Sequence, residues 1–253
     1  MLEIPALFTG LLAGIASGLF GIGGAAIAIP LLHGIFNLSA KESVGTAIFL
    51  AALSAASGAF AFRGKKLVDK KFAASAGLAG IIFSVAGAWL TIKASDSAIA
   101  YAVAGIILFF ALVTFFGGAI RQHHWSRKVR EHRFAAAAAG AFVGAINGFT
   151  GLGGGVPLTA LLGSVYGLSA HAAAATSLAT ILIFSLPGAV AHLALGNTNT
   201  AMLLPLLAGG VIGSQIGVRL GLKVEEKRLR AATASFFLLL GAWMALAELL
   251  KAG

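Results

Sequence analysis

The sequence contains no cysteine among its 253 residues, and only 10% of these residues are charged. The missing cysteine excludes a disulfide framework and a thiolate metal site. The charged share is far below the roughly 25% of an ordinary soluble domain, whereas hydrophobic residues make up 59%. Basic residues outnumber acidic ones by 18 to 8, but they lie in short loops between apolar runs. That distribution is typical of membrane topology rather than of nucleic-acid binding.

Eight apolar segments follow one another along the chain, and several exceed the about 20 residues that span a bilayer. They are 5–36, 44–62, 72–92, 98–120, 134–166, 172–195, 201–220 and 229–250. The start of the chain lacks a basic region, so we expect no cleaved signal peptide. The predicted fold class is an all-α polytopic membrane protein. One polar linker, 121–133, separates a first repeat (1–120) from a second (134–253), and its three histidines are typical of a solvated cytoplasmic loop rather than of a metal site.

The two halves repeat one glycine-rich pattern. Gly18-Leu-Phe-Gly21-Ile-Gly23-Gly24 returns as Gly148-Phe-Thr-Gly151-Leu-Gly153-Gly154, an offset of 130 residues. The same offset pairs Thr46 with Thr176 and Leu38-Ser39-Ala40 with Leu168-Ser169-Ala170. Consecutive glycines favour neither helix nor strand, and an unpaired backbone group in hydrocarbon costs several kcal/mol. Broken helices in paired repeats therefore point to a transporter's binding site.

The broken segments 5–36 and 134–166 could either cross the membrane or enter and return on the same side. If both return, loops 63–71, 121–133 and 219–230 share one side and hold 15 of the 18 Lys and Arg residues. If both cross, the split is 11 to 7. The positive-inside rule favours the re-entrant topology. Six crossings then remain, three per repeat, so the second repeat is inverted and both termini lie outside.

The glycine runs also resemble a known family. Phe20-Gly21-Ile22-Gly23-Gly24 with Pro30-Leu31-Leu32 and Gly45-Thr46 is similar to the first half-signature of the TauE/SafE-type permeases. Gly151-Leu152-Gly153-Gly154-Gly155 with Ala175-Thr176-Ser177 is similar to the second. The resemblance implies a permease of the bacterial cytoplasmic membrane that exports sulfite or organosulfonates. Two features depart from the pattern: Ala25 replaces a third glycine, and Pro157 lies three places before the position that matches Pro30.

An anion also suits the predicted site on physical grounds. Helix N-termini carry about half a positive charge and free N–H donors, and the half-helices that begin near Gly24 and Gly154 would direct them at the membrane centre. The candidate substrate-binding residues are the glycine runs and the polar side chains beside them: Gly21, Gly23, Gly24, Ala25, Thr46, Asn147, Thr150, Gly151, Gly153, Gly154, Gly155, Thr176 and Ser177. In the alternative interpretation these residues only permit tight helix packing, and the hydroxyls bond only to backbone.

Few ionisable groups fall within the apolar segments. His192 is a candidate proton carrier, and Gln215 could line the path or form a hydrogen bond between helices. The carboxylates Asp69, Asp96, Glu131, Glu225 and Glu226 are all expected in loops, so neither a carboxylate relay nor a catalytic set is predicted.

The sequence therefore predicts a secondary transporter that works by alternating access, with an anion channel as the rival and an enzyme disfavoured. No cofactor is expected. The expected partners are a small anion, a coupling proton or sodium ion, and the lipid bilayer of the inner membrane; nucleic acid is not expected, and a homo-oligomer is left open.

Overall fold

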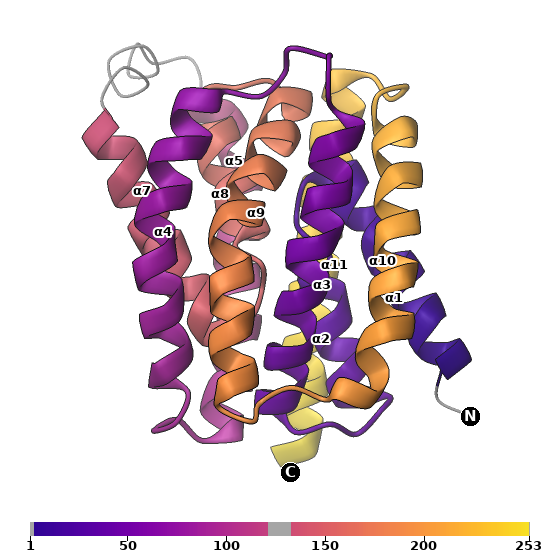
Figure 1. Ribbon diagram of the computed structural model, residues 1–253. Helices are drawn as coiled ribbons and strands as arrows, with labels where there is room; N and C mark the ends of the chain where they lie inside the picture. Colours follow the sequence, from indigo (N-terminus) through magenta and orange to yellow (C-terminus); the bar gives the residue numbers. More distant parts are fainter. Residues whose placement is uncertain (1–2, 121–132, 253) are drawn as a thin grey trace.

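The computed structural model describes residues 3–120 and 133–252, and this part of the chain is a bundle of helices without strands (Figure 1). Linker residues 121–132 lie outside the described residues. The helices are α1 (Glu3–Phe20), α2 (Ala25–Gly34), α3 (Ala40–Ala61), α4 (Lys70–Leu90), α5 (Asp96–Ile120), α7 (Arg133–Thr150), α8 (Gly155–Ser164), α9 (Ala170–Ala194), α10 (Thr200–Gly221) and α11 (Glu226–Ala252).

Counting only described residues, six helices are long and apolar enough to cross a membrane: α1, α3, α4, α5, α9 and α10. This confirms the expected all-α, polytopic class. The set includes α1, whereas the sequence-based topology gave no full crossing to the segment that contains this helix. At 18 residues, α1 only just meets the length of a span.

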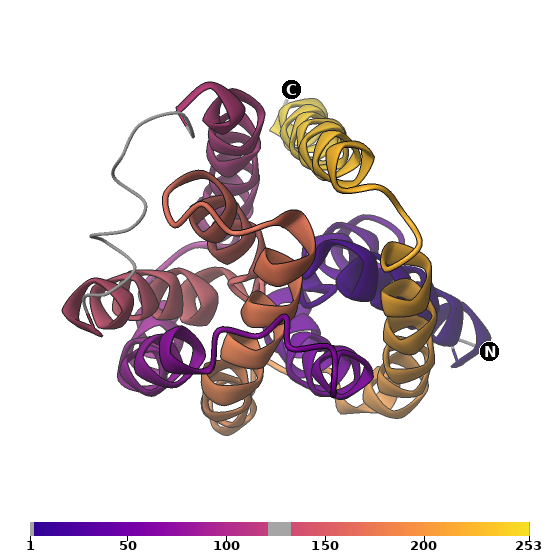
Figure 2. The same cartoon turned by 90° about the horizontal axis from the view of Figure 1, so that it is seen from above.

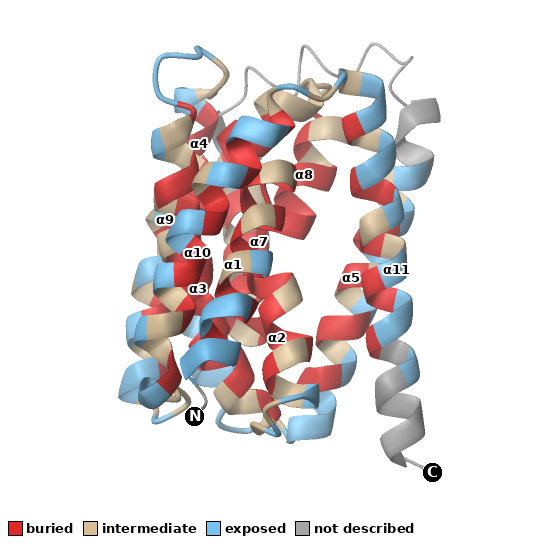
Figure 3. Cartoon of the chain, turned by 90° about the vertical axis from the view of Figure 1, so that its right-hand side faces the viewer, coloured by how far each residue is buried: buried red, intermediate tan, exposed pale blue. Residues whose placement is uncertain are grey.

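Both glycine runs interrupt their segments. α1 ends at Phe20 and α2 begins at Ala25, while α7 ends at Thr150 and α8 begins at Gly155. The half-helices α2 and α8 have 10 residues each, and they lie at opposite ends of the bundle, α2 in the lower half and α8 in the upper half (Figure 3).

Glycine stripes join the two halves of the chain. On α1, Gly10, Gly14 and Gly18 recur every four residues and face α10, where an added Cβ would overlap the backbone carbonyls of Leu206, Gly210 and Ser214. On α7, Gly140, Gly144 and Gly148 face α4 in the same way, against the carbonyls of Ala76, Gly80 and Ser84. Small residues at this spacing let helix backbones approach closely in lipid. Seen from above, α1 (indigo) consequently lies directly beside α10 (orange) (Figure 2).

Helices α3 and α9 form the centre of the bundle, and they are the most buried of the six spans. Ser39 and Glu42 form a capping box that starts α3, and the Ser169 hydroxyl accepts the Ala172 N–H at the start of α9. α5 and α11 pack against each other at one side of the bundle (Figure 3). The centre thus holds the starts of α2 and α8 between α3 and α9.

Candidate functional site

The two glycine loops, residues 21–24 and 151–154, have the same backbone conformation. Gly21, Gly23 and Gly24 have φ values of 75°, 77° and 79°, and their equivalents Gly151, Gly153 and Gly154 have values of 65°, 74° and 68°. The left-handed region costs an L-residue about 1–2 kcal/mol, so glycine is the residue that adopts it routinely. This shared conformation ends one helix and starts the next within four residues.

The loops are buried and touch each other. A Cβ on Gly155 would overlap the backbone of Ile22, and a Cβ on Gly153 would lie 3.8 Å from the Gly23 Cα. Ala51 of α3 packs against both loops, because its Cβ lies 3.3 Å from an added Gly23 Cβ and 2.7 Å from an added Gly153 Cβ. Two stretches far apart in the chain therefore meet at one point in the interior.

Serine hydroxyls hold the carbonyls of the first glycine loop. Ser177 Oγ donates to the Gly21 carbonyl at 2.8 Å, and Ser54 Oγ lies 2.7 Å from the Gly23 carbonyl. Both side chains are fully buried. Ser177 thus touches the loop as the sequence predicts, but it does so as a backbone partner. Ser54 was missed, because the glycine pattern says nothing about which face of the next helix turns toward the loop.

Thr46 and Thr176 are also fully buried, and each accepts a backbone N–H from the other half of the chain. Thr46 Oγ1 accepts the Asn199 N–H at 2.9 Å, and Thr176 Oγ1 accepts the Asp69 N–H at 3.0 Å. Asn199 and Asp69 are the N-cap residues of α10 and α4. The two threonines are equivalent, as the 130-residue offset predicts, and each still carries its own O–H as a donor.

Asn147 and Thr150, the other polar candidates, bond within the bundle. Asn147 Nδ2 donates to Ser84 Oγ at 2.8 Å, and Asn147 Oδ1 accepts from Ser185 Oγ at 3.3 Å. Thr150 Oγ1 donates to the Ile146 carbonyl of its own helix at 2.7 Å. Ser84 and Ser185, which sequence reasoning missed, complete this buried network beside the second loop.

His192 and Gln215 have clear partners. His192 is fully buried, and its Nε2–H donates to the Gly148 carbonyl at 2.7 Å. Since a carbonyl only accepts, the Nε2 atom carries the hydrogen and Nδ1 is the proton-accepting nitrogen. Gln215 Nε2 donates to the Ser57 carbonyl at 2.8 Å, which is a hydrogen bond between α10 and α3, one of the two roles expected for it.

Within residues 3–120 and 133–252, no group of three or more His, Asp or Glu side chains could hold a metal ion, and the linker histidines lie outside these residues. The predicted glycines form two matched loops, and the hydroxyls of Ser54 on α3 and Ser177 on α9 bond to the first of them. Such an arrangement suits the binding of a small polar ligand by backbone groups.

Comparison with known proteins gives the family of the chain. Residues 6–244 match the family model described as "Sulfite exporter TauE/SafE". The chain belongs to the TauE/SafE family. A probable membrane transporter protein of Methanocaldococcus jannaschii is 25% identical over 263 residues, covering 97% of both chains. The probable membrane transporter protein YunE of Bacillus subtilis is 23% identical over 266 residues, covering 92% of this chain and 93% of its own. No solved structure matches. The TauE/SafE membership and the six apolar helices make the chain a multi-pass membrane transporter.

Proposed function

We propose that the protein is a secondary transporter that exports a small anion, sulfite or an organosulfonate, across the bacterial cytoplasmic membrane by alternating access. The observation that carries the proposal is the pair of contacting glycine loops, whose six positive-φ glycines place the starts of two helices at one buried point. Membership of a family described as sulfite exporters supports sulfite as the first anion to test.

The charge of such a ligand would be met by backbone dipoles. α2 and α8 each begin at a glycine loop, at Ala25 and Gly155. A helix N-terminus presents unpaired N–H groups and about half a positive charge, which is the usual setting for a bound anion. The hydroxyls of Thr46 and Thr176, which accept the N–H groups of the N-cap residues of α10 and α4, are further candidate donors. No Lys or Arg side chain is needed there, which favours release as well as binding.

Inverted repeats are part of the proposal, since alternating access by rocking one repeat against the other needs them. Supporting contacts come in equivalent pairs. α1 packs on α10 as α7 packs on α4, and Thr46 bonds to Asn199 as Thr176 bonds to Asp69. The two halves differ by 130 residues at each of these positions.

The orientation follows from the basic loops. Figure 1 shows the α3–α4 and α10–α11 connections at the upper end, and these carry Arg63, Lys65, Lys66 and Lys223. The positive-inside rule assigns this end to the cytoplasm. We infer that both termini lie outside and that the glycine-broken segments enter and return on their own side. In this arrangement the half-helix α8 opens toward the cytoplasm and α2 toward the exterior.

The test is uptake and counterflow by purified protein in liposomes, with sulfite, sulfate, thiosulfate, sulfonates and carboxylates. Gly23→Ala places a Cβ 3.3 Å from Ala51 at φ 77°, whereas Gly64→Ala imposes the same positive φ (81°) in open space. We expect Gly23→Ala to lower transport at least roughly ten-fold, since a misplacement of about 1 Å can cost that much or more, and Gly64→Ala to leave it unchanged. Equal transport rates in both variants would show that the glycine loops do not bind the anion. Large single-channel currents would show that the protein is an anion channel.

A further inference from the structure

A cavity opens beside the first glycine loop, between α5, α8, α9 and α11. We call it the inner cavity, and its lining includes Phe20, Thr114, Thr159, Ser164, Arg230 and Thr233. A second, wider cavity, the outer cavity, lies between α5 and α11 and shares Thr114 and Arg230 with the first. Arg230 therefore stands where the two cavities adjoin.

The size of the inner cavity limits what it can hold. Its volume is ≈ 40 Å³ for the centres of water-sized molecules, and a water needs about 10–15 Å³ on that measure. The space therefore suits a few waters or one small oxyanion rather than a large organic molecule. The outer cavity, at ≈ 290 Å³, is wide enough to admit such an ion with its hydration shell.

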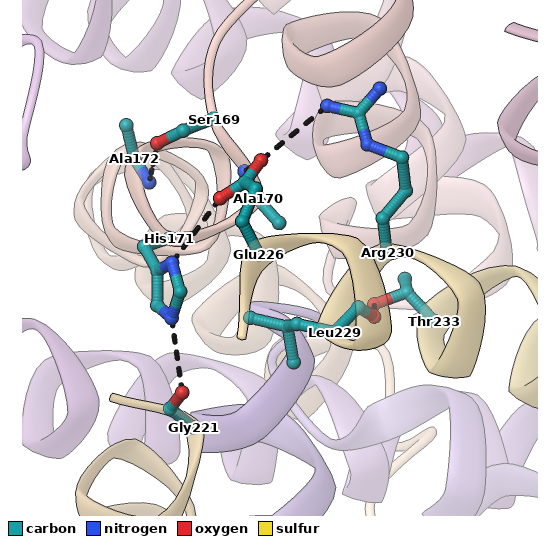
Figure 4. Close-up of polar contacts among 9 residues, drawn as sticks. All are labelled: Ser169, Ala170, His171, Ala172, Gly221, Glu226, Leu229, Arg230 and Thr233. Carbon is teal, nitrogen blue, oxygen red and sulfur yellow. Dashed lines mark hydrogen bonds and ion pairs between the residues drawn. The ribbon is translucent and has the colours of Figure 1, made fainter. Parts of the chain in front are cut away.

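Arg230 gives the inner cavity its charge. Its side chain is only 23% exposed, and Nη2 lies 3.6 Å from Glu226 Oε1 on the preceding turn of α11 (Figure 4). Glu226 makes two further polar contacts: Oε1 accepts the Ala170 N–H, and Oε2 lies 3.3 Å from His171 Nδ1. His171 Nε2 in turn lies 3.0 Å from the Gly221 carbonyl. Glu226 is thus half-buried at the start of α11 rather than in a solvated loop, and it fixes the guanidinium at the cavity.

Lys227 adds a second positive charge in the outer cavity. A half-buried guanidinium binds an oxyanion more strongly than an exposed one because less water screens it. The fork of N–H donors on Arg230 also matches the flat oxygen pairs of sulfur oxyanions and carboxylates.

Hydroxyl groups line the rest of the inner cavity. Thr114, Thr159 and Thr233 each donate to a carbonyl four residues earlier, at 2.7, 2.7 and 2.8 Å, and Ser164 donates to the Val113 carbonyl at 3.3 Å. A carbonyl inside a helix also accepts a backbone N–H, so these hydroxyls can turn toward a ligand at small cost. Thr159 is bonded to the carbonyl of Gly155, the first residue of α8.

Phe20 connects the inner cavity to the glycine loop. It is the last residue of α1, next to Gly21, and its ring stacks on Phe236 of α11 at 4.9 Å between centroids. Ala173, another lining residue, precedes Ala174, which an added Cβ on Gly21 would overlap. The end of the inner cavity is therefore one residue away from the proposed anion site.

We propose that Arg230 forms a second anion site, in which a small free oxyanion from the cytoplasm binds in the inner cavity before it passes Phe20 to the glycine loops. This inference rests on the proposed function and adds to it the route and the residue that selects charge. Phe20, whose ring stacks on Phe236, lines the inner cavity and directly precedes the first glycine loop.

The experiment compares Arg230→Gln with Arg228→Gln. Both remove one positive charge from α11, but Arg228 is 83% exposed and pairs with Glu225, away from the cavity. Sulfite is the probe, measured by uptake into liposomes and by calorimetric binding to purified protein. We expect Arg230→Gln to raise the half-saturating sulfite concentration by roughly ten- to a hundred-fold, the range for loss of a charge-assisted hydrogen bond, and Arg228→Gln to change it less than about two-fold.

Glu226→Gln separates binding from a structural role, because it removes the carboxylate and keeps the guanidinium. On the proposal this variant binds sulfite as tightly as the parent or more tightly, because the glutamine oxygen can still accept from Arg230 while the competing negative charge is gone. Equal losses of affinity and thermal stability in Glu226→Gln and Arg230→Gln would make Arg230 a helix-joining residue and overturn the proposal. Unchanged sulfite affinity in Arg230→Gln would also overturn it.

Lipid is the other source of an oxyanion at this position, since the outer cavity lies between α5 and α11 at the side of the bundle. Parent protein is therefore assayed in liposomes with and without anionic phospholipid. If anionic phospholipid competes with sulfite in the parent and not in Arg230→Gln, a lipid phosphate occupies Arg230 and the proposal is wrong. If the parent binds sulfite through Arg230 but carries no anion, the second site stands and the transport function fails. If Gly23→Ala slows transport while Arg230→Gln does not, the transport function stands and the second anion site fails.

Discussion

Thr46 and Thr176 combine two tasks at the residue scale. Each hydroxyl oxygen accepts the N–H of a helix N-cap residue, Asn199 or Asp69, and each O–H remains available to a ligand. Thr46→Val and Thr176→Val should each destabilise the protein by about 1–3 kcal/mol, because a buried N–H loses its acceptor. Thermal unfolding in detergent measures this loss, and sulfite calorimetry reports the loss of the donor.

The matched controls are Thr46→Ser and Thr176→Ser, which keep the hydroxyl and remove a methyl group. We expect the serine variants to retain sulfite affinity and most of the stability. If the valine variants unfold earlier but bind sulfite normally, the threonines serve only the helix starts. If the valine variants are as stable as the parent, the two hydrogen bonds carry no net free energy.

His192 carries the second residue-scale prediction. Its Nε2–H is bonded to the Gly148 carbonyl, and Nδ1 is buried with no hydrogen-bond partner among the described residues, so Nδ1 is the atom that would take up a proton. His192→Gln keeps an N–H donor for Gly148 and removes the titrating nitrogen. We expect transport to lose its stimulation by a pH gradient while sulfite binding stays within about two-fold of the parent.

His33→Gln is the comparison, because His33 lies near the end of α2, where its Nδ1 atom is 2.8 Å from the Leu38 carbonyl. This variant should keep its response to the gradient. A parent-like response in His192→Gln would limit His192 to its bond with Gly148 and place proton coupling elsewhere.

The residues that sequence alone could identify are those whose backbone is unusual. Glycines at matching offsets predicted both loops, because only glycine adopts positive φ at six such positions without strain. Ser54, Ser84 and Arg230 were not predicted as site residues. The sequence does not show whether a lone serine in an apolar helix, or an arginine beside a basic loop, faces lipid, water or the site. Their roles depend on helix rotation, which the small residues around them leave open.

At the scale of helices, the glycine stripes carry the strongest prediction. Gly14 of α1 faces the carbonyl of Gly210 so closely that a methyl group would overlap it, whereas a Cβ on Gly105 of α5 meets nothing within 4 Å. Gly14→Ala should destabilise the protein by about 1–3 kcal/mol through overpacking. Gly105→Ala should stabilise it by about 0.5–1 kcal/mol through helix propensity.

Thermal unfolding of the two variants in the same detergent measures the difference in their stability, because the detergent affects both variants equally. Gly144→Ala, on the equivalent face of α7 against Gly80, should behave like Gly14→Ala. If Gly14→Ala is as stable as Gly105→Ala, α1 and α10 do not rely on close backbone contact.

The helices themselves were easier to predict than their partners. Apolar runs bounded by charged or glycine residues fall within a few residues of the helices from α3 to α11, because hydrocarbon demands that backbone groups bond internally. Asp96 and Glu226 begin helices instead of lying in loops, since a carboxylate favours a helix N-terminus. The pairing of α1 with α10 and of α7 with α4 needed the structure, because many helices in this chain carry small residues.

At the scale of the whole molecule, the proposed transport mechanism places one half-site at each end of the bundle. The inner cavity lies beside α8, and Gly163 and Ala173 are among its lining residues. The 130-residue offset gives His33 and Ser43, beside α2, as the equivalent residues in the first half. Arg230 has Ala100 as its equivalent, so the positive charge belongs to one side only. On the proposed function, this asymmetry would favour collection of the anion at the cytoplasmic end.

The last prediction concerns the topology of the whole molecule, and the absence of native cysteine makes it direct to test. Glu3→Cys, Ile35→Cys and Lys65→Cys each place a single thiol at an exposed position. We expect an impermeant thiol reagent on intact cells to label the first two and not Lys65→Cys, because the segment formed by α1 and α2 enters and returns on the outside. Permeabilised cells, in which all three should react, provide the control. Labelling of Lys65→Cys alone would reverse the orientation. Labelling of only one of Glu3→Cys and Ile35→Cys would show that this broken segment crosses the membrane, as the 18-residue length of α1 alone would permit.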